Sequence, residues 1–535
     1  MKQYMLMAAA MASIAAALPA QNIIDATRYG STQIMGSARY NAMAGAFGAL
    51  GGDLSCMNDN PAGMAIYRGT NSFTITPRLS FVGTSSRGTE KVSRSDNDFA
   101  ISNLGTVFSF RNEDGGSLVN FNLGIGFSRN YTNHSQLNVI NDGTRNTFSQ
   151  YLTARANDYL KTLTKPNVSD AFDWDNPYTT APFLTMLGAE VAAFDINDAN
   201  TSRVINHFNG WEGYQALYMR ERTRQDNYNI SASMNFDDQF YVGATLVITD
   251  YNSTISTEMD ENYTYDLDGS YLAFDNNVET KGSGVGVNLG FIWNPIDNWR
   301  IGAAIHTPTW NKMKEFLDGG MMTYDYSEDI NYGWDSYNDS WNYRFSTPWE
   351  YQFSAAYIIG TKGLISLEYD LRDFTTMRYY NEDSNGYSGF DFSSYNQAIK
   401  DYMQAQHTIK VGAEYRLSDQ VSLRAGYAHV TSPYKDDALN ARIPSNRQSA
   451  AYNSTLKTNF TTQGDQNYIT CGLGWRGENW FADLSFMYHV MATKVAINPA
   501  DAYNDLNQFS NPVVCEQFDV DVNTKNFDLT IGYRF

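Results

Sequence analysis

The chain has 535 residues, which is long enough for several soluble domains. It carries 58 acidic and 38 basic side chains and a formal net charge of −20, so we expect no nucleic-acid partner, because phosphate binding needs a basic face. Aromatic residues make up 14% of the chain, which excludes a disordered protein. The three cysteines, Cys56, Cys471 and Cys515, are too scattered to predict a disulfide framework or a zinc site.

Residues 1–20 have the features of a secretory signal peptide. Lys2 supplies the positive charge, Met5–Leu18 is almost wholly apolar, and Ala20 is a small residue at the predicted cleavage point. The apolar run is too short to cross a membrane as a helix together with its flanks, and no longer run follows it. We therefore expect an exported protein; a short membrane anchor is the alternative.

From residue 71 onward, the chain predicts a series of β-strands. Apolar residues alternate with polar or small ones at a period of two, which is typical of strands that have two unlike faces. The predicted strands are residues 71–82, 99–110, 119–127, 222–236, 240–248, 285–293, 299–305, 351–359, 365–371, 409–415, 421–427, 469–475, 480–490 and 527–535. They number 14, an even count.

Short and long connections alternate strictly between these strands. The long ones are residues 83–98, 131–221, 253–278, 308–347, 377–405, 432–465 and 493–523. An outer-membrane barrel has tight periplasmic turns and long external loops, whereas a β-sandwich has no reason to keep its long loops at one end. Within the longest loop, 131–221, residues 147–163 and 181–193 have helical character.

The alternation also assigns an outer and an inner face. In the last strand, Leu529 and Ile531 belong to an apolar row that ends on Phe535, and Asp528 and Thr530 belong to a polar row. A barrel in lipid has this apolar exterior and polar interior, and its closure satisfies every strand edge. We therefore predict an all-β fold over residues 71–535, a 14-stranded antiparallel transmembrane β-barrel with long extracellular loops.

Residues 21–70 precede the first predicted strand and do not alternate. They are rich in glycine, alanine and methionine, and they end in the element Asn60-Pro61-Ala62-Gly63. Small residues allow a chain to pack closely against a barrel wall. We interpret this segment as a hatch that plugs the lumen; a loosely ordered tail is the alternative.

This segment resembles the N-terminal hatch of the FadL/TodX family of outer-membrane transporters. The resemblance rests on Gly36-x-x-Arg39, the small-residue stretch after it, the acidic turn at Asp53, and Asn60-Pro61-Ala62-Gly63. The 14 strands and the terminal phenylalanine agree with the architecture of that family. The predicted loops 131–221 and 308–347 are longer than the family needs.

The resemblance implies a passive outer-membrane channel for hydrophobic small molecules, such as long-chain fatty acids or aromatic hydrocarbons. Ligand would pass a site beside the hatch and leave through a gap in the wall at a kinked strand. Gly124 and Gly126 are our candidates for that kink, and simple clearance of the lumen is the alternative. The expected partners are the hydrophobic ligand, outer-membrane lipid and lipopolysaccharide, and the barrel assembly machinery. We expect a monomer without cofactor or metal.

Candidate ligand contacts follow from the chemistry of a fatty acid. A carboxylate needs a cation at the end of an apolar pocket, and methionine and aromatic side chains of the hatch supply apolar surface. The candidates are Met43, Phe47, Arg78, Arg372, Lys410 and Arg424. Acidic residues are also predicted to face inward, so these cations could instead form a structural ladder of ion pairs inside the barrel.

The sequence gives little support for catalysis. It contains no HExxH, P-loop or GxSxG motif, and its six histidines show no ligand spacing. We therefore predict that the protein is not an enzyme. A second hypothesis is a FadL-like barrel that acts as a protein-binding scaffold in secretion or surface attachment. A general porin is a third, against which the predicted hatch argues.

Overall fold

The computed structural model describes residues 20–535 except for 114, 162, 164–166, 173–180, 182, 197–202, 209–211, 265–268, 327–329, 382–391, 437, 439–459 and 498–515. The predicted signal peptide lies outside the described residues, apart from Ala20. In the part of the chain that is described, no helix has both the length and the apolar character needed to cross a membrane.

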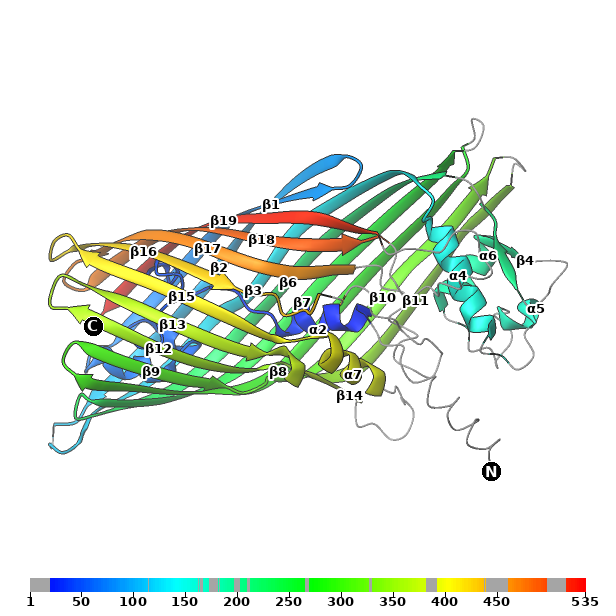
Figure 1. The fold of residues 1–535 in the computed structure, drawn as a ribbon. Coiled ribbons are helices and arrows are strands. Elements are labelled where there is room, and N and C mark those ends of the chain that lie inside the picture. The colour runs from blue at the N-terminus through cyan, green and yellow to red at the C-terminus, as the bar shows by residue number, and fades with distance from the viewer. Residues whose placement is uncertain are drawn as a thin grey trace, which may run out of the picture.

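Most of the described chain forms one antiparallel sheet of seventeen strands, which closes where β1 pairs with β19 (Figure 1). The strands are β1 (Ser72–Arg87), β2 (Lys91–Arg111), β3 (Leu118–Thr144), β6 (Glu212–Phe236), β7 (Phe240–Thr264), β8 (Tyr271–Ile296), β9 (Trp299–His306), β10 (Trp310–Asp325), β11 (Ile330–Ser346), β12 (Trp349–Ile359), β13 (Gly363–Asp373), β14 (Arg378–Asn381), β15 (Ala405–Arg416), β16 (Val421–Val430), β17 (Phe460–Arg476), β18 (Trp480–Ala496) and β19 (Gln517–Arg534).

Three wall segments of the barrel are each made of two strands in line. β9 continues as β10, β11 continues as β12, and β13 continues as β14, so the wall has 14 segments. The predicted 14-stranded antiparallel barrel is confirmed.

The strands run further than the alternation predicts. β3 and β6 extend into the two ends of the predicted loop 131–221, and β10 and β11 occupy most of the predicted loop 308–347, so both loop predictions were wrong in extent. In β10 the pattern is reversed, because Lys312 and Lys314 face outward while Met313 is buried. A strand that stands above the bilayer has water outside, and it therefore loses the apolar outer row on which the prediction depended.

The outer wall carries an apolar belt. Exposed apolar side chains recur on neighbouring strands: Phe73, Leu79, Ile125, Ile230, Leu246, Leu289, Ile301, Phe353, Leu367, Ile409, Leu473, Leu484 and Leu529. Trp293, Trp299, Trp475 and Trp480 are exposed beside the short turns. An apolar surface of this extent, bordered by aromatic residues, is that of a lipid-facing barrel wall.

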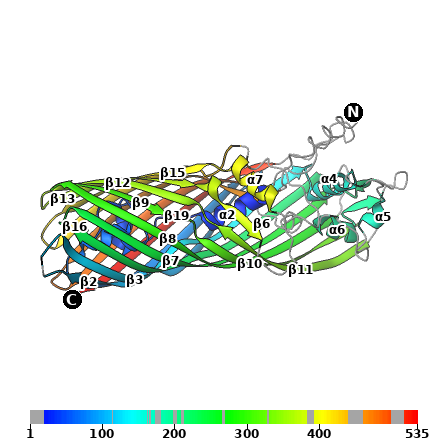
Figure 2. The same cartoon turned by 90° about the horizontal axis from the view of Figure 1, so that it is seen from below.

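The N-terminal residues lie inside the barrel. They form α2 (Ala20–Gly30), α3 (Ala38–Ala42), η1 (Leu54–Met57) and η2 (Pro61–Tyr67), drawn in blue within the bore in Figures 1 and 2. Almost all side chains of residues 23–65 are buried, and these elements contact strands around the barrel. We call residues 20–67 the plug.

The end of the barrel opposite the C-terminus carries a small cap (Figure 1). Its elements are α4 (Phe148–Lys161), α5 (Val168–Ala171), α6 (Phe183–Glu190), β4 (Phe194–Ile196) and β5 (Val204–Asn206). Their apolar side chains share one core with inward-facing residues of β7, β8 and β10. Helices α4 and α6 lie in the two segments that the sequence predicts to be helical. We call the described residues of 148–208 the cap. Two further elements, η3 (Phe374–Thr376) and α7 (Ser393–Tyr402), flank β14.

His207 joins the cap to the wall. Its Nδ1 lies 2.9 Å from both carboxylate oxygens of Asp195, and its Nε2 lies 2.9 Å from Oδ2 of Asp325 at the end of β10. The hydrogen bond to Asp195 is the largest cause that raises the pKa of His207 above its ordinary 6.5, and Asp325 adds to the increase while burial opposes it.

This raised pKa predicts that the docking of the cap on the barrel wall depends on pH. The imidazolium stabilises cap docking fully below about pH 6.5, and the contribution is lost as the pH rises through the folded-state pKa. We expect the amide protection factors of α4 and α6, measured by hydrogen exchange, to decrease as the pH rises through the folded-state pKa of His207. In the variant His207→Gln this decrease should be absent. Protection that stays constant in the unmodified protein would contradict this role.

Candidate functional site

Three neighbouring wall segments are interrupted at the same level. β9 and β10 are separated by residues 307–309, β11 and β12 by residues 347–348, and β13 and β14 by residues 374–377. The β8 ladder passes from the pair Asn288–His306 to the pair Val285–Trp310, so the β9–β10 segment bulges by one residue against β8. We call residues 307–309, 347–348 and 374–377 the wall break.

Two prolines explain why the pairing fails here. Pro308 and Pro348 have no backbone N–H and cannot donate to a strand ladder. Side chains replace part of the lost pairing, since Oγ1 of Thr347 accepts from the backbone N–H of Thr309 at 2.8 Å. A backbone bond of 3.2 Å from Thr347 N to Thr309 O also spans the break. The wall is therefore held by fewer backbone hydrogen bonds at the break than along the regular ladders beside it.

A cavity of about 130 Å³ lies on the inner side of the wall break. Thr307, Thr309, Thr347 and Pro348 line it from the break. The plug contributes Tyr29, Gly30, Thr32, Gln33, Ile34, Met35, Tyr40, Asn58 and Asp59. We call this space the main cavity. A ligand in it would touch the plug and the wall break together.

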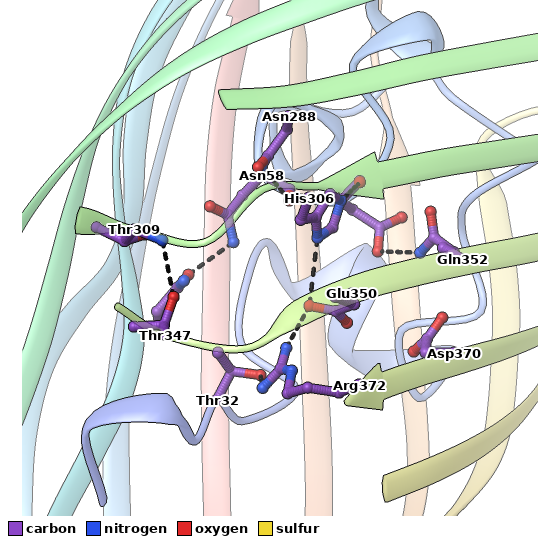
Figure 3. Close-up of polar contacts among 12 residues, drawn as sticks. Thr32, Asn58, Asn288, His306, Thr309, Thr347, Glu350, Gln352, Asp370 and Arg372 are labelled. Carbon is purple, nitrogen blue, oxygen red and sulfur yellow. Dashed lines mark hydrogen bonds and ion pairs between the residues drawn. The ribbon is translucent and has the colours of Figure 1, made fainter. Parts of the chain in front are cut away.

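A chain of polar contacts connects the plug to the strands that end at the break (Figure 3). His306 Nε2 donates to the backbone oxygen of Asp59 at 2.6 Å, and His306 Nδ1 lies 3.3 Å from Glu350 Oε2. Arg372 donates to Glu350 and to Thr32 of the plug. The three side chains come from β9, β12 and β13. The position of the plug is thus coupled directly to the strand ends at the break.

The predicted hatch motif Asn60-Pro61-Ala62-Gly63 fixes the plug against the wall. Oδ1 of Asn60 accepts from the backbone N–H of Ala62 at 3.1 Å, which caps η2. Its Nδ2 donates to Gly48 O at 2.6 Å within the plug and to Phe291 O at 3.3 Å in β8. One side chain therefore organises the plug and attaches it to the barrel.

Two wall glycines allow this close approach. Gly243 and Gly290 are paired across β7 and β8. A Cβ on Gly243 would lie 2.3 Å from the carbonyl carbon of Pro61, and one on Gly290 would lie 2.0 Å from Asn60 Oδ1. A larger residue at either position would displace the motif.

Gly124 and Gly126 lie in a regularly paired part of β3. β3 pairs with β2 and β6 without a register shift from Asn120 to Arg129. A Cβ on Gly124 would lie 2.1 Å from Met57 Cε, and one on Gly126 would lie 3.1 Å from Met57 Sδ. The two glycines make room for the plug, which is the alternative that the sequence left open. The interruption of the wall lies at the break instead.

The predicted ligand-binding cations all occur in ion pairs. The pairs are Arg78–Asp528, Arg372–Glu350, Lys410–Glu368, Lys410–Asp370, Arg424–Glu414 and Arg424–Asp483. This is the structural ladder that the sequence left as the alternative to carboxylate binding. A buried pair of this kind leaves its cation little capacity for a further anion.

The structure also separates these residues in space. Arg372 and Lys410 line the main cavity, and Arg78 lines a second cavity of about 80 Å³. Arg424 lines neither of these two cavities. Met43 and Phe47 also line neither, because both are buried in the apolar core of the plug.

Sequence reasoning missed the wall break and the main cavity. The available signal was the pair of Thr-Pro dipeptides at 307–308 and 347–348, one in each of two consecutive wall segments. Proline inside a strand marks an edge or an interruption. The two dipeptides stand at the two ends of the predicted loop 308–347, outside the predicted strands, so this signal was not used.

Comparisons with known proteins support the fold. No family model matches the chain, and no curated protein matches it. A FadL homologue from Pseudomonas aeruginosa is similar in structure with a TM-score of 0.52 and 13% identity, over 94% of this chain and 99% of that one. The toluene transporter TodX from P. putida is similar with a TM-score of 0.50 and 10% identity, over 95% of this chain and 99% of that one. The chain therefore has the fold of FadL-type outer-membrane barrels.

Proposed function

We propose that this protein is a passive outer-membrane channel for hydrophobic small molecules. The observation that carries the proposal is the main cavity, which lies between the plug and an interrupted part of a wall with an apolar exterior. A hydrophobic solute gains nothing from a water-filled pore, whereas a sideways path into lipid transfers it to a medium that it favours. The toluene transporter with the same fold is consistent with such a substrate class.

The proposed route runs from the cap end of the barrel to the main cavity and then outward through the wall break. The polar chain through His306, Glu350 and Arg372 gives the plug a means to control the strand ends at the break. A shift of Asp59 or Thr32 would alter the contacts of those three side chains. The plug is thus the gate in this proposal.

The filled bore argues against the general porin. Residues 23–65 are almost entirely buried within the barrel, so a wide aqueous passage would require the plug to leave. A hydrophobic ligand needs only local movement beside the main cavity. The plugged barrel therefore favours a selective channel over a pore for hydrophilic solutes.

The experiment is uptake by a bacterial host whose own channels for hydrophobic compounds are deleted. We expect the full chain to increase uptake of at least one compound among oleate, toluene and monooleoylglycerol. The double variant Asn60→Ala/Pro61→Ala removes hydrogen bonds that position the plug beside the wall, each worth about 1 kcal/mol. Because the plug is then misplaced as a gate, that uptake should fall about fivefold or more. Asn298→Ala, at an exposed turn, is the matched control.

The barrel must remain folded for this result to be informative, which its heat-dependent gel mobility reports. If the full chain gives no more uptake of any of these compounds than the empty host, the proposed transport function is wrong. If uptake occurs but the double variant matches the control, the plug is not the gate.

A further inference from the structure

The main cavity is lined mostly by groups that form hydrogen bonds. Besides the plug and the wall break, the barrel contributes Asn130, Gln225, Asn227, Asn288, Gln406, Thr408 and Gln466. A volume of about 130 Å³ far exceeds the roughly 10–15 Å³ that a cavity needs to hold one water. The space is thus large enough for a small polar group, and its lining is unsuited to a bare hydrocarbon.

The lining has acceptor oxygens in excess. Oδ2 of Asp59, Oε1 of Gln225 and Oδ1 of Asp370 are buried and have no hydrogen-bond partner among the described residues. The three side chains are only 7%, 6% and 4% exposed. Buried acceptors without donors are unfavourable, so a ligand that brings donors would be stabilised here.

The ion pairs in the cavity also disfavour a carboxylate ligand. Lys410 is bound to Glu368 at 2.6 Å and to Asp370 at 2.7 Å, and Arg372 is bound to Glu350. Asp59 adds a carboxyl group that forms no ion pair with any described residue. A carboxylate ligand would therefore find Lys410 and Arg372 already paired with carboxyl groups of the barrel.

The wall break offers a place for an apolar chain. Pro348, Thr309 and Thr347 line the cavity at the break, and Trp310, the next residue along, is 55% exposed on the outer wall. An alkyl chain attached to a group in the cavity would reach the apolar belt by this path once the hydrogen bonds between Thr309 and Thr347 open. The geometry thus suits a molecule with a polar head and an apolar tail.

Building on the proposed transport function, we propose that the main cavity binds the uncharged, hydroxyl-bearing head of an amphiphile, such as a monoacylglycerol, in preference to the carboxylate of a fatty acid. The hydroxyl groups donate to Asp59, Gln225 and Asp370, and the acyl chain lies toward the wall break. This specifies the substrate class within the hydrophobic compounds that the fold and the apolar belt suggest.

Binding to the purified full chain in neutral detergent tests the proposal. Monolauroylglycerol, laurate and dodecyltrimethylammonium have similar apolar chains and different heads, and their bound fractions can be compared at equal concentration by native mass spectrometry. We expect monolauroylglycerol to bind about tenfold more tightly than laurate, which corresponds to about 1.4 kcal/mol. Equal or tighter binding of laurate, or tightest binding of the cationic amphiphile, would overturn the assignment of the head group.

A pair of variants locates the effect. Gln225→Met removes one unpartnered acceptor from the cavity and should reduce the preference for monolauroylglycerol over laurate at least threefold, an effect of the size of one modest hydrogen bond. Asn229→Leu is the matched control, because its Oδ1 also has no hydrogen-bond partner among the described residues but it does not line the main cavity. Equal effects of the two variants would overturn the proposed site.

The two proposals fail in different ways. If cells take up hydrophobic compounds but the protein prefers laurate, transport stands and the head-group assignment is wrong. If neither uptake nor binding of any amphiphile occurs, the transport function itself is wrong.

Discussion

A covalent link between residues 309 and 347 is expected to stop uptake of hydrophobic compounds. In a variant with the native cysteines replaced by serine, Thr309→Cys and Thr347→Cys place two thiols across the wall break, where the wild-type side chain of Thr347 already accepts from Thr309 N at 2.8 Å. If ligand leaves between these strands, a link keeps them together. We expect uptake to fall at least about tenfold on oxidation or thiol crosslinking and to recover on reduction.

The control is a second cysteine pair on the same two strands. Lys314 and Asn342 are paired in β10 and β11 beyond the break, and both are exposed. Linking them constrains the same strands without closing the break, so uptake should be retained. Undiminished uptake after complete linking of residues 309 and 347 would mean that ligand leaves elsewhere.

The second large effect concerns the stability of the barrel. Arg78→Met should lower the free energy of unfolding by about 3–5 kcal/mol, because it leaves Asp528 as a buried charge without its cation. In the native pair, Arg78 Nε lies 2.6 Å from Asp528 Oδ1, and the two side chains are only 2% and 0% exposed. Urea-induced unfolding in detergent measures the change.

Two comparisons make this prediction specific. The double variant Arg78→Met/Asp528→Leu removes both charges and should recover most of the lost stability. Arg87→Met breaks the exposed pair Arg87–Asp521 and should cost less than about 1 kcal/mol. Similar losses for Arg78→Met and Arg87→Met would show that burial of the ion pairs is not what makes the ladder stabilising.

The membrane part of the barrel was predictable because lipid imposes a simple rule on the sequence. The row Leu529, Ile531, Phe535 must be apolar, and the intervening residues face the polar interior. Above the bilayer that rule ends, and β10 instead exposes Lys312 and buries Met313. A strand with water outside and a protein core inside has no pattern that distinguishes it from an amphipathic loop.

The site was less predictable because it depends on contacts between distant residues. Gly124 is a flexible position in the sequence, and only the contact with Met57 shows that it serves packing. Arg78 is a cation on an inner row, and only closure of β1 on β19 reveals that Asp528 neutralises it. The motif around Asn60 was recognisable because its capping and turn chemistry is local.

Photolabelling tests the central claim of a sideways route most directly. A monoacylglycerol with a diazirine at the end of its chain is added to cells that produce the protein, and labelled residues are identified by mass spectrometry. A route past the plug predicts labels at Thr309, Thr347 and Pro348 and on plug residues 30–35, which compete away with excess unlabelled compound. Labels confined to outward-facing residues such as Phe353 and Leu367, with none at the wall break or on the plug, would contradict it.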